Sequence, residues 1–153
     1  MYNRPIVPAS FIVPERFETT AFMLRPLTVH DVIRDYDAVM SSAVELKDRM
    51  MDNSPWPEGL TLEENLIDLG WHQREFTIRH SFAYTVVSHD GARCLGCCYI
   101  YPSSDPASDA AGFYWARQSR IGDAADLDLG DAFRGWLAHD WPFRRVAFPG
   151  RNA

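Results

Sequence analysis

The pattern that most constrains the fold is a set of three strand-like segments placed close together in the second half of the chain. Residues 81–88 (SFAYTVVS) and 94–101 (CLGCCYIY) are rich in β-branched and aromatic residues, and the Asp90-Gly91 pair between them is typical of a hairpin turn. A third segment, 110–117 (AAGFYWAR), follows after a short loop. Consecutive strands with short connections pair antiparallel, so the chain is expected to fold around an antiparallel sheet.

Helical periodicity lies on both sides of these strands. Thr28 with Asp31 and Thr61 with Glu64 have the spacing of a capping box, so a helix is expected to follow each threonine. Three sets of apolar residues recur at intervals of three and four. They are Val29, Val32, Ile33, Tyr36, Val39, Met40 and Ala43; Leu62, Leu66, Leu69 and Phe76; and Leu129, Phe133, Trp136 and Leu137. We therefore expect two amphipathic helices before the hairpin and one after the third strand.

Two further strands complete the expected order of elements. Residues 21–27 (AFMLRPL) predict a first strand, and 143–148 predict a last strand after the third helix. The order β-α-α-β-β-β-α-β is that of an α+β domain, with the last strand parallel to its predecessor. Residues 1–18 contain three prolines and are expected to form an extended N-terminal arm, which leaves 19–153 as a single domain.

The charge balance argues against several classes of partner. With 15 Lys and Arg against 21 Asp and Glu, the formal net charge is -6, so binding to nucleic acid or to an anionic membrane is not expected. No apolar run approaches the roughly 20 residues that span a bilayer. The N-terminal stretch, which prolines interrupt, does not resemble a signal peptide. Three cysteines, two of them adjacent, suit a reducing compartment, and we expect a cytoplasmic protein.

The order of these segments resembles the GNAT acetyltransferase family. RFETTAFMLRPLTVHDV (16–32) is similar to that family's first strand and helix start. HDGARCLGCCYIY (89–101) is similar to the hairpin of its second and third strands, and GFYWAR (112–117) to its fourth strand. The resemblance covers about residues 17–149. It implies a mainly antiparallel sheet flanked by helices, without the family's last helix and strands.

The same resemblance implies a site for acetyl-CoA. In that family the cofactor lies where two strands separate, and its pyrophosphate binds a Gln/Arg-x-x-Gly-x-Gly/Ala loop at a helix start, where unpaired N–H groups attract an anion. Residues 119–124 (SRIGDA) match this loop at its glycine and alanine, with a serine in place of Gln or Arg. The implied cofactor-binding residues are Arg117, Ser119, Arg120, Gly122 and Ala124.

The aspartates at the start of the same helix point the other way. Asp123 and Asp126 flank the expected helix start. A carboxylate in the first turn uses the same N–H groups and dipole as a phosphate, at about 0.3–1 kcal/mol each. Two interpretations therefore stay open: an ordinary capped helix, or a cofactor-binding loop in which these carboxylates compete with the pyrophosphate.

No catalytic residue is assigned from the sequence. The family's fourth strand often supplies a glutamate as general base, but 110–117 contains no acidic residue, and nothing after the last strand corresponds to the family's tyrosine acid. The loop carrying Asp52, Asn53, Trp56 and Glu58 lines the acceptor side in the family. Trp56 is expected either to contact a bound amine or to anchor this loop. Tyr114 and Trp115 face opposite ways on the fourth strand, so one of them is expected to line the wedge and the other to fill the core, and Tyr114 is taken as the substrate contact.

The cysteines and histidines are not expected to bind a metal. On a regular strand Cys94 and Cys98 point to one face and Cys97 to the other, so the three thiols would not converge. His72 and His80 lie eight residues apart on one helix, with no third ligand in the sequence pattern. We interpret the cysteines as buried structural residues.

Two functional hypotheses follow. The first is an N-acetyltransferase that transfers an acetyl group from acetyl-CoA to an amine of a small molecule or peptide. The second is a non-catalytic GNAT-like binding or assembly module. The last strand carries Phe143, Val146 and Phe148 and has no following element to cover it, which predicts a homodimer. The N-terminal arm is the alternative cover for the same surface.

Overall fold

The structure is a computed structural model that describes residues 3–47 and 55–151. A single sheet of six strands runs in the order β1-β2-β3-β4-β5-β6. The strands are β1 (Phe17–Glu18), β2 (Met23–Pro26), β3 (Phe82–Val87), β4 (Cys94–Tyr101), β5 (Ala110–Ala116) and β6 (Val146–Ala147). All neighbours pair antiparallel except β5 and β6, which are parallel as predicted.

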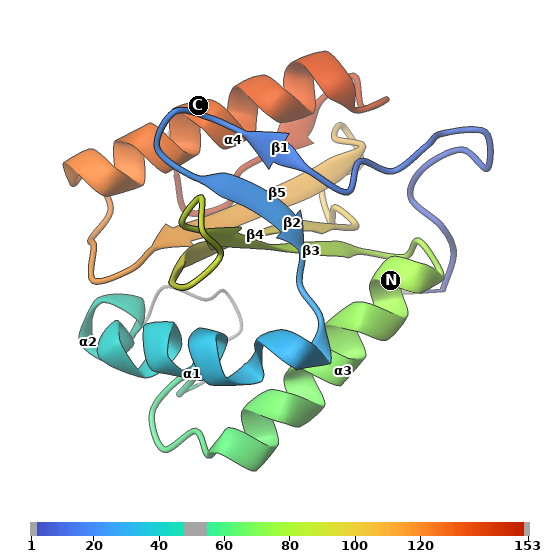
Figure 1. The fold of residues 1–153 in the computed structure, drawn as a ribbon. Coiled ribbons are helices and arrows are strands. Elements are labelled where there is room, and N and C mark those ends of the chain that lie inside the picture. The colour runs from blue at the N-terminus through green and yellow to red at the C-terminus, as the bar shows by residue number, and fades with distance from the viewer. Residues whose placement is uncertain (1–2, 48–54, 152–153) are drawn as a thin grey trace.

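The helices cover both faces of this sheet (Figure 1). On one face lie a single 3-10 turn (Val29–Asp31), α1 (Val32–Ser41), α2 (Ala43–Leu46) and α3 (Leu62–Thr77). On the other face lies α4 (Ala124–Asp140), together with the N-terminal arm. This arrangement confirms the predicted α+β class. The sequence shows no periodic signal for the two short edge strands or for the break between α1 and α2. Of the two edge strands, β6 lies within the strand predicted over 143–148, whereas β1 was not predicted.

Two apolar cores lie on the two faces of the sheet. Tyr84, Phe133 and Trp136 belong to the core under α4, and Val39 and Leu69 belong to the core under α1 and α3. Both predicted capping boxes are present, because each threonine accepts a backbone N–H while the acidic residue three positions later accepts the threonine N–H. The sequence therefore marks both helix starts correctly.

The predicted apolar faces of the first two helices are wrong at three positions. Ile33, Leu62 and Leu66 are exposed. In α3 the predicted Leu69 is buried, and the other two fully buried positions are polar, Asn65 and Glu75. Asn65 takes a core position because its amide finds a buried hydrogen-bond partner, which a hydrophobic count does not detect.

A bulge in β4 reverses the face on which one cysteine was expected. The register with β3 shifts so that Val86 pairs with Gly96 and Val87 with Cys94. The extra residue breaks the simple alternation of side chains. Cys94 and Cys97 consequently lie in the same core, under α1 and α3, while Cys98 lies in the core under α4.

The N-terminal arm packs on the side of the sheet that carries α4. Phe11 contacts the ring of Trp141 at 5.2 Å between centroids, and Phe17 stacks on Trp136 at 5.0 Å. Phe143, Val146 and Phe148, the side chains behind the expected dimer, are partly buried against the same core. The homodimer stays a prediction. The N-terminal arm packs against the same core as Phe143, Val146 and Phe148, the side chains on which the predicted dimer contact depends.

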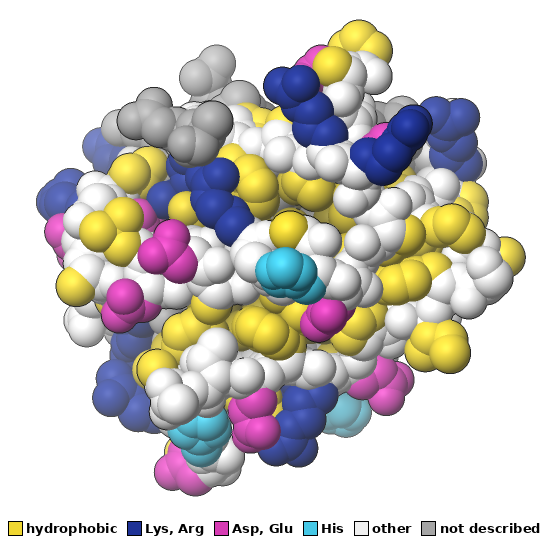
Figure 2. Space-filling view, turned by 90° about the horizontal axis from the view of Figure 1, so that it is seen from above, with side chains coloured by type: hydrophobic (Ala, Val, Ile, Leu, Met, Phe, Trp, Pro, Cys, Tyr) yellow, Lys and Arg dark blue, Asp and Glu magenta, His cyan; other side chains and the backbone are white. Residues whose placement is uncertain are grey.

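The surface over α4 and the arm mixes charges of both signs. Figure 2 shows basic and acidic side chains scattered among apolar ones on this face. Within the described ranges, no helix has both the length and the apolar character needed to cross a membrane.

Candidate functional site

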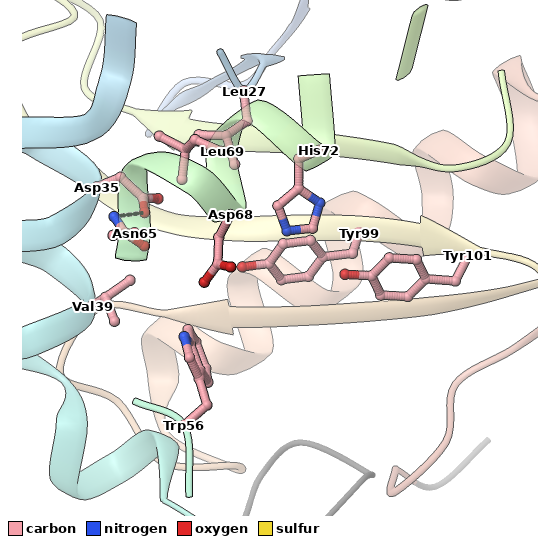
Figure 3. Close-up of a pocket in the computed structure, with 10 residues that line it drawn as sticks. All are labelled: Leu27, Asp35, Val39, Trp56, Asn65, Asp68, Leu69, His72, Tyr99 and Tyr101. Carbon is pink, nitrogen blue, oxygen red and sulfur yellow. Dashed lines mark hydrogen bonds between the residues drawn. The ribbon is translucent and has the colours of Figure 1, made fainter. Parts of the chain in front are cut away.

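A small cavity of about 210 Å³ opens between α1, α3 and the sheet (Figure 3). Ten residues from distant parts of the chain line it. They are Leu27, Asp35, Val39, Trp56, Asn65, Asp68, Leu69, His72, Tyr99 and Tyr101. The sequence predicts only Trp56 among these as a binding residue. The others escape notice because the cavity forms where α1, α3 and β4 meet in space.

Aromatic rings form one side of the cavity. Tyr99 and Tyr101 alternate along β4, and their rings are nearly parallel with centroids 5.8 Å apart. The hydroxyl of Tyr99 accepts a hydrogen bond from Trp115 Nε1 at 3.0 Å, which fixes the ring, and burial raises the pKa of this phenol. The His72 ring lies 5.5 Å from that of Tyr99, so the imidazole joins the aromatic side.

His72 is a neutral base at this site. Burial lowers its pKa to about 4, and its Nδ1 atom is buried without a hydrogen-bond partner among the described residues. Desolvation disfavours the charged imidazolium. The ring therefore adds no positive charge to the cavity near neutral pH.

Two carboxylates face the cavity from different helices. Asp35 on α1 is buried and accepts hydrogen bonds from Asn65 Nδ2 at 2.9 Å and from the Cys97 thiol at 3.4 Å. Asp68 on α3 points toward the Tyr99 ring in Figure 3. Desolvation raises the pKa of both groups, and the charge of Glu64 adds to this effect at Asp68. The cavity thus combines a buried, hydrogen-bonded acid with a more accessible one.

The buried imidazole predicts a measurable loss of stability in acid. Between the ordinary pKa of 6.5 and about 4, the unfolded chain binds a proton at His72 that the folded chain does not bind. This makes the free energy of unfolding decrease by about 1–3 kcal/mol as the pH falls through that window. Asp35 and Asp68 have raised pKa values and act in the opposite direction, so the comparison needs a variant that keeps both.

We therefore expect His72→Phe to lose less stability than the unsubstituted protein between pH 7 and pH 4.5. Urea unfolding at both pH values measures the difference. Parallel losses in the two proteins would contradict a neutral buried imidazole at this position.

The cysteines next to the cavity require a correction. Asp35, Cys94 and Cys97 each offer one ligand atom, and these three atoms lie within 4.8 Å of one another, contrary to the expectation that the two thiols point to opposite faces. The bulge in β4 is the cause. The groups hydrogen-bond one another and the backbone: Cys97 donates to Asp35 at 3.4 Å and Cys94 to the Gly96 carbonyl at 3.3 Å. These bonds satisfy both thiols in the core.

The loop before α4 runs from the end of β5, where Gln118 donates to Ser42 after α1, to the helix on the other face of the sheet. Gly122 has a φ of +96°, and a Cβ atom added there would meet open space. Ala124 begins the helix, and the side chain of its N-cap residue, Asp123, makes no capping hydrogen bond. Arg120 and Gly122 are exposed, whereas Ser119 is buried. The predicted loop, 119–124, therefore leads directly into an exposed helix start.

The aspartates already bind part of this loop. Asp123 accepts the N–H of Arg120 at 2.8 Å, and Asp126 accepts the N–H of Gly122 at 3.0 Å. Arg117 points away from the loop, toward Asp37 and Ser41 of α1, at 2.8 and 3.1 Å. The carboxylates therefore compete with an anion for the N–H groups of the loop. The N–H groups in the first turn of α4 are not capped by Asp123.

Arg151, which the sequence does not predict as a functional residue, links the start of α4 to β5. Arg151 makes two bonds to the Asp126 carboxylate at 2.8 and 2.9 Å and one to the Tyr114 carbonyl at 2.8 Å. Its guanidinium also lies 3.6 Å from the centroid of the Tyr114 ring. The pair is almost fully buried, with side-chain exposures of 9% for Arg151 and 1% for Asp126.

Tyr114 and Trp56 do not share a cavity. Tyr114 lines a hollow of about 430 Å³ beside Gly122, Asp126 and Arg151, under α4. Trp56 lines the cavity under α1 and α3. The two predicted substrate contacts thus lie on opposite faces of the sheet. Asp52 and Asn53, named with Trp56, fall outside the described residues.

Comparisons with solved structures define the class of fold. The chain matches a ribosomal-protein-S5-alanine acetyltransferase from Vibrio fischeri with a TM-score of 0.61 at 14% identity, covering 80% of this chain and 66% of that one. It matches the microcin C7 self-immunity acetyltransferase MccE, in complex with acetyl-CoA and AMP, with a TM-score of 0.61 at 10% identity over 82% of this chain and 68% of the other.

A third match is RimL, a ribosomal L7/L12 α-N-protein acetyltransferase in complex with coenzyme A, with a TM-score of 0.57 at 18% identity, covering 82% of this chain and 67% of RimL. The chain spans about two thirds of the length of these structures. The sequence matches no protein-family model and no curated protein. The chain therefore has the GNAT acetyltransferase fold, as the resemblance predicts.

Proposed function

We propose that the protein is an N-acetyltransferase of GNAT type that takes its acetyl group from acetyl-CoA. The observation that carries this proposal is the opening between β5 and β6 beside an uncapped helix start. The two strands pair at only two positions, Ala110 with Val146 and Ala111 with Ala147. Beyond these positions β5 has no strand partner on this edge among the described residues. Arg151 takes the Tyr114 carbonyl there, so we expect the amides of a pantetheine arm to pair with the remaining backbone groups of β5.

The residues near this opening fit the cofactor in part. The first turn of α4 offers uncapped N–H groups at Ala124 and Ala125, and the open space at Gly122 allows a phosphate to approach them. Arg120 is exposed beside them and supplies a positive charge. The loop N–H groups taken by Asp123 and Asp126 are the part that does not fit, so we assign the pyrophosphate to the helix start. When bound, acetyl-CoA supplies an activated acyl group as a thioester.

Two solved structures of this fold support the choice of cofactor, since MccE is in complex with acetyl-CoA and RimL with coenzyme A. The cavity between α1, α3 and β4 lies on the opposite face of the sheet from α4. Its position beside β4 makes it the proposed site for the acceptor, with Trp56 and Tyr99 among its walls. The catalytic residues stay unassigned.

Coenzyme A binding tests this proposal. We expect Gly122→Glu to abolish the heat of binding in a calorimetric titration, because the new carboxylate blocks and repels the pyrophosphate. Gly91→Glu is the matched control: this hairpin glycine also has a positive φ, at +72°, and open space at its Cβ position. It should bind coenzyme A normally. Equal affinity of both variants would place the cofactor elsewhere, and no binding by the unsubstituted protein would favour the non-catalytic module.

A further inference from the structure

We propose that the cavity under α1 and α3 binds a small primary amine in its cationic form, with an aromatic or apolar body, and that Asp68 receives the ammonium group. The inference rests on the proposed function only in naming this amine as the acetyl acceptor. Binding of the amine itself follows from the walls of the cavity.

The size of the cavity limits the ligand. At about 210 Å³ it is smaller than the roughly 300–1,000 Å³ typical of sites for drug-sized molecules. Leu27, Val39 and Leu69 line it with buried aliphatic side chains. Such walls accommodate a compact apolar body and exclude a long polar one.

The charge of the cavity selects the sign of the ligand. Among the described residues, Asp35 and Asp68 are the only acidic groups that line it, no Lys or Arg does, and burial keeps His72 neutral. Acidic side chains with no basic residue beside them disfavour an anion and favour a cation. A bound cation would also relieve the raised pKa that desolvation causes at Asp68.

The two carboxylates have different roles. Asp35 lines the cavity, but it is buried and held by Asn65 and Cys97. Asp68 accepts no hydrogen bond from any described residue in this structure, and its carboxylate points into the cavity (Figure 3). Asp68 is therefore the group available to accept bonds from an ammonium, whereas the oxygens of Asp35 are already bonded to Asn65 and Cys97.

The aromatic walls favour an ammonium over a simple metal ion. Trp56, Tyr99 and Tyr101 present rings to the same space. Ring faces attract organic cations by their quadrupole and pack against an apolar body at the same time. A hard cation such as Mg²⁺ requires several oxygen ligands, and this cavity offers it only two carboxylates from separate helices.

A matched pair of ligands tests the inference on the unsubstituted protein. 2-Phenylethylamine carries an ammonium group at neutral pH, and 2-phenylethanol has almost the same shape without the charge. We expect calorimetry, without coenzyme A, to give an affinity for the amine at least about tenfold higher than for the alcohol, in keeping with a charge-assisted hydrogen bond. Equal affinities, or binding of neither ligand, would overturn the proposal.

A matched pair of variants tests the role of Asp68. Asp68→Asn keeps the shape of the side chain and should weaken binding of the amine about tenfold while leaving 2-phenylethanol unchanged. Glu63→Gln removes an exposed carboxylate from the same helix and should change neither ligand. An Asp68→Asn variant with unaltered amine affinity would remove Asp68 from the site.

The two proposals can fail separately. Binding of the amine without binding of coenzyme A would uphold this inference and contradict the acetyltransferase. Binding of coenzyme A without discrimination between amine and alcohol would uphold the acetyltransferase and contradict this inference.

Discussion

Replacing Arg151 by methionine is expected to lower the free energy of unfolding by about 3 kcal/mol. The guanidinium makes two bonds to Asp126, one to the Tyr114 carbonyl, and covers the Tyr114 ring. Removing it leaves the Asp126 carboxylate, which is 1% exposed, without its positive partner. A buried unpaired charge costs far more than the pair itself contributes, so the loss should be large.

Two controls separate this effect from the mere loss of an arginine. Arg120→Met removes an exposed arginine of the same region and should cost less than about 1 kcal/mol. The double variant Arg151→Met, Asp126→Asn should be more stable than Arg151→Met alone, because it no longer buries an unpaired charge. Chemical denaturation measures all three variants. Equal losses for Arg151→Met and Arg120→Met would show that the buried pair is not formed.

Gly96→Ala is expected to lower the free energy of unfolding by about 3 kcal/mol or more. Gly96 lies in the bulge of β4 with a φ of +154°, and a Cβ atom would come within 2.2 Å of the carbonyl oxygen of Trp115. The contact is with the backbone of the neighbouring strand, which cannot move without breaking the pairing of β4 with β5. The substitution combines conformational strain with a clash in the centre of the sheet.

Two other glycines provide matched controls. Gly91→Ala also places alanine at a positive φ, but in open space, and should cost about 1 kcal/mol. Gly135→Ala lies within α4 with open space around its Cβ position and should stabilise the protein by about 0.5–1 kcal/mol. Thermal or urea unfolding tests the order. A Gly96→Ala variant no less stable than Gly91→Ala would contradict the close approach at the bulge.

The fold follows from the sequence where the signal is local. The strand predicted over 94–101 coincides with β4. The strand predicted over 81–88 is one residue longer than β3 at both ends, and the strand predicted over 110–117 is one residue longer than β5 at its C-terminal end. Alternation and turn residues mark these strands in the sequence. The apolar face of α4 is confirmed, since Leu129, Phe133, Trp136 and Leu137 are all buried. Gly96 within the strand is a local signal for a bulge, but the faces of the cysteines were predicted from regular alternation, so the predicted face of Cys94 is wrong.

The candidate site is harder to predict because it joins segments far apart in the chain. Asp35, Asp68 and Tyr99 come from α1, α3 and β4, and only the folded sheet brings them to one cavity. One signal was visible in α3: Asn65 lies four residues before Leu69 on a helix that has one apolar side. A polar residue in line with core residues indicates a buried hydrogen bond, and here its partner is Asp35.

The central claim is that this chain transfers an acetyl group from acetyl-CoA to an amine, and mass spectrometry of the reaction products tests it most directly. The protein is incubated with acetyl-CoA and 2-phenylethylamine, and the formation of the N-acetyl amide is followed together with release of free coenzyme A. We predict equal amounts of the two products with the unsubstituted protein, and neither product above background with Gly122→Glu. An amine that stays unmodified across a panel of small primary amines, although coenzyme A binds, would contradict the claim and leave a GNAT fold that acts only as a binding module.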